Sequence, residues 1–282
     1  MAQRVIDLCK RGAEQNNKAK YRQGNVILLP EAAEVVVTGD LHGHRRNFER
    51  ITQYADLETN HNRHIIFQEI LHGGPEDECG GCLSFRVFAD IIEYQLRYPD
   101  RVHLIMGNHD TAIINDRDVL KNGKEMNRAL TGAMQRCFGD QYEEVSTALD
   151  EYLFSQPLAV KSPNGVWISH SLPKDRFVDD FDPSIFERPL TSEDLHRPNS
   201  VYLLTWGRRH SESTLQTLAE MLGVDIFILG HQAQDSGWCK AGKNLIILAS
   251  DHDRGCMLKF ETDKTYTANE LAEAIIPLAS LD

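Results

Sequence analysis

Short apolar runs rich in β-branched residues recur along the chain, with helical or polar segments between them. They cover residues 35–38, 65–67, 102–106, 166–169, 226–229 and 245–249. Unbroken apolar runs of this length are typical of strands that are covered on both faces. The pattern therefore predicts six buried strands, spread over most of the chain.

Two segments in the first third of the chain have apolar residues at helical spacing. One covers residues 3–20, and the other lies between the second and third predicted strands, at residues 84–100. The second segment has one apolar face and a proline just past its end: Phe85, Phe88, Ile91, Ile92, Leu96 and then Pro99. A strand, a helix and a strand in close succession favour βαβ units, so a largely parallel sheet is expected here.

The later half of the chain predicts further helices and one long loop. Residues 125–155 have the pattern of two helices, and residues 267–276 begin with Thr267 and Glu270 at the spacing of a capping box. Residues from about 171 to 200 are irregular, and a loop of this length in a compact domain is more often functional than decorative. No stretch resembles a linker, so residues 1–282 are expected to form a single domain.

The composition excludes several classes of function. The chain has 282 residues, of which 41% are hydrophobic, and a formal net charge of −12. An acidic surface repels a phosphate backbone, so no long nucleic acid is expected as a partner. No apolar stretch approaches the roughly 20 residues that span a bilayer, and the N-terminus lacks the apolar region of a secretory signal. We therefore expect a cytoplasmic protein that does not bind membranes.

The six cysteines are too sparse for a disulfide scaffold. Only Cys79 and Cys82 are closely spaced, and a structural zinc site would need two further ligands nearby. We expect two ordinary reduced thiols at these positions, and redox switching stays open.

Residues of the types that bind metals follow four of the predicted strands. They are Asp40 and His42 after the first strand, Asn108 and His109 after the third, His170 after the fourth, and His231 after the fifth. In open α/β folds a site lies just outside the carboxyl ends of the strands, so these side chains are expected to meet. A single histidine after a strand is more often a hydrogen-bonded loop residue than a metal ligand. It is much less common for four strands to end in such residue types by chance.

The mixture of ligand types points to divalent transition metals. Asp40 and His42 are two residues apart, and the glycines at 39 and 43 allow a tight turn in which both side chains converge. Carboxylate and imidazole ligands together suit Mn, Fe or Zn, and two ions bridged by a carboxylate would use this set. The sequence therefore predicts two divalent metal ions as cofactors.

These residues also resemble a known family. GDLHG at 39–43, YPDRVHLIMGNHD at 98–110, His170 after a strand and GH at 230–231 follow the order and spacing of the phosphoprotein phosphatases. These are the PPP-type serine/threonine phosphatases among the calcineurin-like metallophosphoesterases. The resemblance covers about residues 26–260 and implies an α/β fold, a four-layer sandwich of two mixed β-sheets flanked by helices.

The resemblance also implies roles for single residues. Asp40 and His42 would hold one metal, Asn108, His170 and His231 the other, and His109 would be the general acid that protonates the leaving alcohol.

The family's second motif, GD-x-VDRG, is divergent in this chain, where residues 68–74 read QEILHGG. Glu69 stands in place of the bridging aspartate, and we expect it to bridge the metals. His72 replaces the aspartate that orients the acid histidine, and it would pair with His109 in catalysis without a fixed negative charge. Gly73 replaces an arginine that grips the phosphate.

Another cation is expected to take that arginine's place. Arg208 or Arg209 is the best candidate, after a predicted strand at residues 203–204 and in a segment that resembles the family's tryptophan-containing segment near the phosphate. A solvated basic turn is an equally ordinary interpretation. His252 follows the strand at 245–249 and is a further candidate for the substrate site, with a plain turn as its alternative.

The expected reaction is direct hydrolysis of a phosphomonoester by a metal-bridging water. By resemblance, the substrate is phosphoserine or phosphothreonine in a phosphorylated protein, or else a small phosphoester. Two alternatives stay open. One is a nucleotide hydrolase similar to diadenosine tetraphosphatases, and the other is a catalytically weakened binding protein, which the changes at 69, 72 and 73 would suit.

Overall fold

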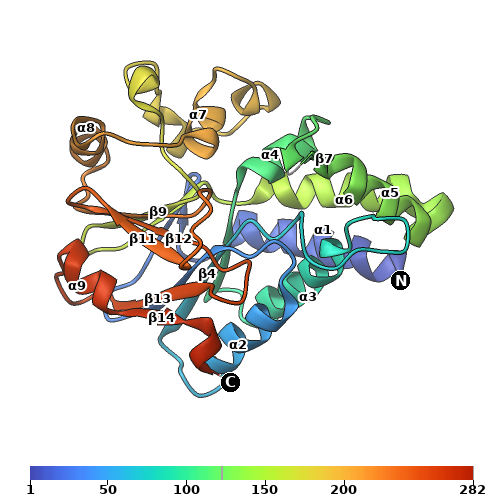
Figure 1. Ribbon diagram of the computed structural model, residues 1–282, viewed down its shortest axis with the longest axis horizontal. Coiled ribbons are helices and arrows are strands. Elements are labelled where there is room, and N and C mark those ends of the chain that lie inside the picture. The colour runs from blue at the N-terminus through green and yellow to red at the C-terminus, as the bar shows by residue number, and fades with distance from the viewer. Residues whose placement is uncertain (122, 282) are drawn as a thin grey trace.

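The computed structural model describes residues 1–121 and 123–281, and two mixed β-sheets form the centre of the molecule (Figure 1). The larger sheet has seven strands in the order β1 (Arg22–Gln23), β2 (Val26–Leu28), β8 (Ala159–Lys161), β9 (Val166–Ser169), β10 (Ile226–Leu229), β12 (Leu245–Leu248) and β11 (Trp238–Ala241). The smaller sheet has five, in the order β14 (Ile275–Pro277), β13 (Cys256–Glu261), β3 (Glu34–Asp40), β4 (Arg63–Gln68) and β5 (Val102–Ile105). A separate hairpin pairs β6 (Leu120–Lys121) with β7 (Lys124–Glu125).

All six strands predicted from the sequence are present, as β3, β4, β5, β9, β10 and β12. Strands β3, β4 and β5 run parallel, as the βαβ pattern predicted.

Helices cover the outer faces of both sheets. The α-helices of the described residues are α1 (Ala2–Lys18), α2 (Arg45–Ala55), α3 (Ser84–Arg97), α4 (Asn108–Ile114), α5 (Met126–Phe138), α6 (Tyr142–Ser155), α7 (Ser200–Trp206), α8 (Glu212–Leu222) and α9 (Ala268–Glu273). The 3₁₀ helices are η1 (Gly139–Gln141), η2 (Asp175–Phe177), η3 (Pro183–Phe186), η4 (Ser192–Leu195) and η5 (Leu278–Leu281). The predicted N-terminal helix, the helix before Pro99 and the two helices within 125–155 are confirmed.

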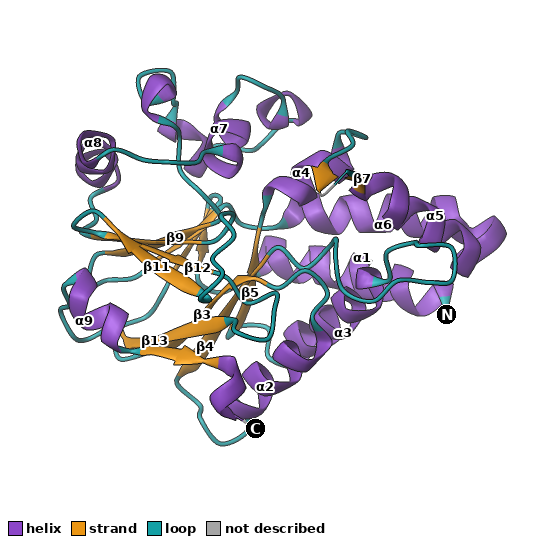
Figure 2. Cartoon of the chain, in the orientation of Figure 1, coloured by secondary structure: helices purple, strands orange, loops and turns teal. Residues whose placement is uncertain are grey.

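Alternating side chains along the strands explain the layers. In β3, Val35 and Val37 face the core between the sheets, whereas Val36 faces the core shared with α1, α3 and α6. In β10, Ile228 faces the core between the sheets and Phe227 faces the core shared with α7 and α8. Because both faces of these strands are covered, their sequences are apolar without interruption. Figure 2 shows the resulting strands between two groups of helices, and the predicted four-layer sandwich is confirmed.

The two sheets meet where β3 and β12 end. Asp40 and Ala249 form an isolated parallel bridge, and the Ser250 N–H donates to the Asp40 carbonyl at 3.0 Å. A side chain at Gly39 would place its Cβ 2.1 Å from the Leu248 carbonyl oxygen, so only glycine permits this approach. The strand ends of both sheets are therefore brought to one place.

The predicted strand at residues 203–204 is wrong, because this segment is helix α7. A run of two leucines is too short to separate strand from helix by pattern. Buried Val201 and Leu204 are three residues apart on one helical face, and the Thr205 hydroxyl donates to the Val201 carbonyl at 2.9 Å.

Two further boundaries differ from the prediction. The capping box of Thr267 and Glu270 is present, but α9 ends at Glu273, and Ile275 and Ile276 pair with β13 as strand β14. β-Branched residues beside an open strand edge extend the sheet in preference to the helix. The irregular segment at 171–200 contains η2, η3 and η4, so it is more regular than expected. Among the described residues, no helix has the length and apolar character needed to cross a bilayer.

Candidate metal centre

The metal-ligand residue types that follow the strands lie together at the seam of the two sheets. Asp40 ends β3, Glu69 follows β4, and Asn108 begins α4 directly after β5. His170 follows β9 and His231 follows β10, so the larger sheet contributes two imidazoles. All five side chains are buried. The parallel strands place these residues at one edge because their carboxyl ends coincide.

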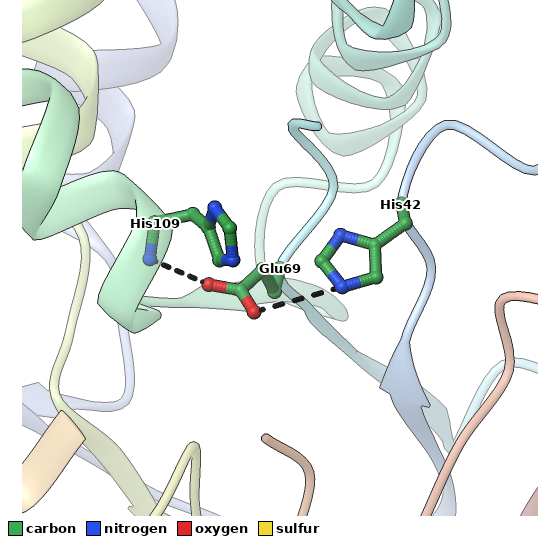
Figure 3. A group of neighbouring side chains, drawn as sticks. All are labelled: His42, Glu69 and His109. Atoms are coloured by element: carbon green, nitrogen blue, oxygen red, sulfur yellow. Dashed lines mark hydrogen bonds and ion pairs between the residues drawn. The ribbon is translucent and has the colours of Figure 1, made fainter. Parts of the chain in front are cut away.

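The carboxylate of Glu69 lies between the side chains of two histidines. Figure 3 shows His42 on one side of its carboxylate and His109 on the other. Glu69 Oε2 is 3.9 Å from His42 Nε2, and Asp40 Oδ2 is 3.8 Å from the same nitrogen. His42, Glu69 and His109 each offer a ligand atom within 4.8 Å of the others, which is close enough to share one ion.

The same carboxylate belongs to a second group of ligand atoms. Glu69, His170 and His231 also offer atoms within 4.8 Å of one another. His170 Nε2 is 3.4 Å from Glu69 Oε2 and 2.8 Å from Asn108 Oδ1. Glu69 therefore connects the two groups, at the position where a bridging ligand would lie.

Local contacts fix the glutamate in this position. Glu69 Oε1 accepts a hydrogen bond from the His109 backbone N–H at 2.7 Å. A Cβ at Gly107 would come within 2.7 Å of the same oxygen, so glycine at this position leaves room for the carboxylate. The longer side chain of glutamate, compared with aspartate, is accommodated by this space.

Asp40 is fixed from the other sheet. Its Oδ1 accepts from the His231 backbone N–H at 2.9 Å and lies 3.5 Å from His170 Nδ1. A Cβ at Gly230 would lie 2.3 Å from this oxygen. The glycine of the Gly230-His231 pair thus makes room for the carboxylate that the smaller sheet contributes.

Four residues of the site have left-handed backbone conformations, which residues other than glycine rarely adopt. The φ angles are 43° at His42, 36° at Glu69, 68° at His72 and 64° at His231. Each such residue costs on the order of 1 kcal/mol and persists only where surrounding contacts impose it. Strain of this kind gathers at functional sites, and here the four residues follow three strand ends, those of β3, β4 and β10.

Known proteins that resemble this chain point to one family. The family model described as calcineurin-like phosphoesterase matches residues 33–235. The chain belongs to this family.

A serine/threonine-protein phosphatase of Caenorhabditis elegans is 21% identical over 230 residues, which cover 77% of this chain and 47% of that protein. Human serine/threonine-protein phosphatase 5 is 26% identical over 115 residues, which cover 41% of this chain and 21% of that protein. The PPP-type resemblance is confirmed, and the chain spans about half or less of the length of these relatives.

Solved structures agree on the fold of this calcineurin-like phosphoesterase. A Saccharomyces cerevisiae protein serine/threonine phosphatase, described as similar to human phosphatase PP5, has a TM-score of 0.66 at 12% identity and covers 92% of this chain and 82% of its own. A cold-active protein-tyrosine phosphatase of a psychrophilic Shewanella has a TM-score of 0.58 at 14% identity, covering 92% and 83%. At this identity the two structures show the metallophosphoesterase fold alone.

The imidazoles from the larger sheet are neutral at pH 7. Burial, with a smaller effect of the Arg208 charge, lowers the pKa of His170 to about 3. Burial also lowers the pKa of His231 well below its ordinary value, and the neighbouring His170 and Arg208 act in the same direction. Neutral imidazoles have a free lone pair for a metal ion, and the proton that would compete for it is absent.

His109 and His72 lie next to each other, as the divergent second motif predicted. Their ring centroids are 4.6 Å apart with the planes tilted by 55°. His109 lines the cleft above the site, whereas His72 is fully buried and does not. His72 therefore supports the ring of His109 from the protein side and does not meet the contents of the cleft.

A cleft of about 440 Å³ opens above these residues in this phosphoesterase. Of the predicted site residues, Asp40, His42, Glu69, Asn108, His109, His231 and Arg208 line it. Arg208 reaches the second group of ligand atoms, where its Nε donates to His231 Nε2 at 3.0 Å. The predicted alternatives, Arg209 and His252, are not among the lining residues.

The ring of His252 is occupied elsewhere. Its Nε2 lies 2.9 Å from the Gln234 carbonyl, and its Nδ1 accepts from the Arg254 N–H at 3.2 Å. The neighbouring Asp251 lines the cleft in its place. The rule that polar residues at strand ends meet could have identified Asp251, because it lies two residues beyond the predicted strand at 245–249.

The outer wall of the cleft was not expected from the sequence. Val119 and Leu120 reach it from the hairpin segment, and Leu120 is 71% exposed. Gln232 lines the cleft as well, and so does Trp206, which belongs to the segment that the resemblance placed near the phosphate. No strand end or motif marks residues 119 and 120, so only the folded chain brings them to the site.

Proposed function

We propose that this calcineurin-like phosphoesterase hydrolyses phosphomonoesters with two divalent metal ions that share Glu69. The single observation that supports this most strongly is that Glu69 belongs to both groups of ligand atoms, on the floor of one cleft. A shared carboxylate between two ligand groups is the arrangement that two-metal phosphoesterases use.

The donor atoms fit such ions. His42 and Glu69 would hold one ion together with Asp40, whose Oδ2 is 3.8 Å from His42 Nε2, and His109 of the same group would be left as the proton donor. Glu69, Asn108, His170 and His231 would hold the other ion. Carboxylate and amide oxygens mixed with neutral imidazoles suit Mn, Fe or Zn. Bound there, the ions would lower the pKa of a water molecule and neutralise charge on the phosphate.

The chain's own side chains supply the remaining steps. Arg208 would bind the phosphate oxygens, taking the place of the arginine that Gly73 replaces. A metal ion held by His231 through Nε2 would occupy the lone pair that Arg208 now contacts, and the guanidinium would then be available to the substrate. His109 would donate a proton to the leaving oxygen, and His72 would hold the ring of His109 in position.

The proposed substrates are phosphoserine and phosphothreonine in proteins. The relatives named serine/threonine-protein phosphatases support this class, although each shares only part of its length with this chain. Phosphotyrosine and diadenosine tetraphosphate are the competing substrates in the test. We further propose that residues 1–282 act as a single domain, since the core between the sheets draws on strands from both halves of the chain. The cytoplasmic location and the lack of nucleic-acid partners stay predictions.

The test is hydrolysis of p-nitrophenyl phosphate by chelator-stripped protein that is resupplied with Mn²⁺, Fe²⁺ or Zn²⁺. We expect turnover that requires metal and is lost in Asp40→Asn, because this change removes a charged ligand and leaves the fold intact. Phosphoserine, phosphothreonine and phosphotyrosine peptides and diadenosine tetraphosphate then rank the substrates. Bound metal without turnover on any of them would contradict the proposal and favour a binding protein.

A further inference from the structure

A second, smaller pocket adjoins the catalytic cleft on the far side of Trp206. Trp206 lines both spaces, so its indole forms the wall between them. The pocket holds about 70 Å³. Its charged and aromatic lining consists of Lys174, Arg176, Phe177, Arg197, Tyr202 and Trp206.

The charge of this pocket differs from that of the segment that forms it. Residues 171–200 contain four basic and seven acidic side chains, yet three of the basic ones and none of the acidic ones line the pocket. The fourth, Arg188, pairs with Asp194 at 2.6 Å. Asp175 is adjacent in sequence, but its Oδ1 accepts from the Ser211 N–H at 2.9 Å.

The three pocket cations have no carboxylate partner among residues 1–121 and 123–281. Like charges held close together repel each other, and an acidic chain with a net charge of −12 offers many carboxylates that could have paired with them. Lys174, Arg176 and Arg197 line one pocket and are therefore available to an anion from outside the chain.

Aromatic contacts surround the boundary between the pocket and the cleft. The Arg176 guanidinium lies 4.5 Å from the centre of the Phe177 ring. Tyr202 and Trp206 stack with centroids 5.5 Å apart and planes at 15°. The Trp206 Nε1–H donates to the Thr111 hydroxyl at 3.2 Å, which ties the indole to α4, the helix that carries His109.

We propose that this pocket binds a second anionic group of the substrate, so that the enzyme prefers phosphopeptides with a further carboxylate or phosphate near the phosphorylated residue. The inference rests on the proposed function, because it assigns a substrate class to the same cleft. The pocket is small, at about 70 Å³, and its three cationic side chains suit a carboxylate or a phosphate, which accept charge-assisted hydrogen bonds.

The test compares peptides that differ at one neighbouring position. A phosphoserine peptide carries Glu, phosphoserine or Gln at that position, and a series moves the position along the peptide. The readout is the ratio of kcat/KM for each anionic peptide to that for its Gln counterpart, measured within one protein. A general loss of activity in a variant cannot imitate a change in this ratio.

We expect the wild-type ratio to reach about tenfold at the best position, as one charge-assisted contact provides. The double variant Arg176→Gln/Arg197→Gln should bring the ratio close to one, and Arg176→Lys should retain part of it. Arg117→Gln is the matched control, because Arg117 is an exposed arginine that lines neither space and bonds His196. It should keep the wild-type ratio. The Glu and phosphoserine arms show which anion the pocket prefers.

Binding of the same peptides to the metal-free protein, measured by calorimetry, separates the two proposals. A preference for the anionic peptides that disappears in the double variant supports the pocket even if no turnover is found, in which case only the proposed function fails. Turnover with equal kcat/KM for anionic and neutral peptides at every position overturns the pocket and leaves the proposed function intact. Equal loss of the ratio in Arg117→Gln would also overturn it, since overall charge would then be the cause.

Discussion

The two ends of strands β4 and β5 both carry buried histidines, yet only one end has the arrangement of a metal site. At the amino ends, His64 and His103 stack with centroids 5.5 Å apart, and His64 Nδ1 lies 3.2 Å from His103 Nε2. The space beside His103 holds only about 10 Å³. At the carboxyl ends, Glu69 and His109 contact further ligand types and open into a cleft of about 440 Å³.

The difference shows what separates a candidate metal ligand from a histidine of the scaffold. The His64–His103 pair satisfies its own hydrogen bond within the scaffold, and no carboxylate takes part in it. The histidines of the two ligand groups share a carboxylate with one another, and His42, His109 and His231 among them line the cleft. Burial alone is therefore a poor indicator, whereas a mixture of ligand types at coinciding strand ends is a good one.

The largest effect is expected where a methyl group would invade the site. Gly230→Ala places a Cβ 2.3 Å from Asp40 Oδ1, so the carboxylate must move. We predict a loss of kcat of roughly 100-fold or more, because a displacement of about 1 Å in a catalytic group has that effect. Gly132→Ala is the control, since its Cβ would meet only the flexible end of Arg136. Equal activity of the two variants would show that Asp40 need not occupy this position.

The next prediction distinguishes the role of His109 from that of the neighbouring His72. His109→Ala should lower kcat by about 100-fold, as removal of a general acid does. His72→Ala should lower kcat by about tenfold and keep the metal content, because His72 acts only through the position of His109. His72→Asp should move the alkaline limb of the pH–rate profile to higher pH, since a negative charge favours the protonated imidazole. A profile that does not move would remove His72 from the mechanism.

At the amino ends of β4 and β5, we expect the two buried histidines to affect the stability of the fold and not the activity. Burial lowers the pKa of His64 to about 4 and that of His103 to about 3, both below 6.5. As the pH falls below 6.5 the unfolded chain takes up protons that the folded chain does not, so the free energy of unfolding decreases. Between pH 6.5 and 5 this amounts to on the order of 2 kcal/mol per histidine.

Denaturant unfolding at several pH values measures this effect. His103→Gln should make the pH dependence of the free energy of unfolding less steep than in the wild type, and metal-dependent turnover at pH 7 should stay unchanged. The comparison with the variant cancels the opposite contribution of Asp110, whose pKa burial raises to about 7. An unchanged pH dependence would show that the pair does not couple folding to protonation.

The smallest effect is expected at the exposed wall of the cleft. Leu120 is 71% exposed and lines the cleft, so it would contact a bound substrate and contributes little to folding. Leu120→Ala should raise KM for p-nitrophenyl phosphate a few-fold and leave kcat unchanged, because it removes about 1 kcal/mol of apolar contact. Met221→Ala, an exposed apolar residue on α8 outside the cleft, should change neither constant. A fall in kcat alone would mean that Leu120 acts on the chemistry.

The parts predictable from sequence are those that strand periodicity governs. Strands covered on both faces must be apolar throughout, so β3 and β10 were recognisable, and the residues that end them had to meet at one edge. The altered second motif was equally visible, since Glu69 and His72 occupy the positions that the family's motif assigns.

The remaining parts depend on contacts between distant segments. The two-leucine run at 203–204 did not reveal helix α7, because burial on one helical face is a tertiary property. Leu120 and the basic pocket carry no local pattern, since the pocket is assembled from η2 with the preceding Lys174, from Arg197 and from α7. The choice of His252 over Asp251 failed to anticipate that the imidazole would bond to the backbone of Gln234, a distant residue, and of Arg254.

The most direct test of the site is a metal count on Glu69→Gln, made together with turnover of p-nitrophenyl phosphate. This change keeps the size of the side chain and removes the charge that both ligand groups share. We expect about two metal ions per wild-type chain, as a two-metal site requires. In Glu69→Gln both the metal content and the turnover should be lost. Full metal content with wild-type turnover in this variant would contradict a bridging role for Glu69, and with it the proposed two-metal reaction.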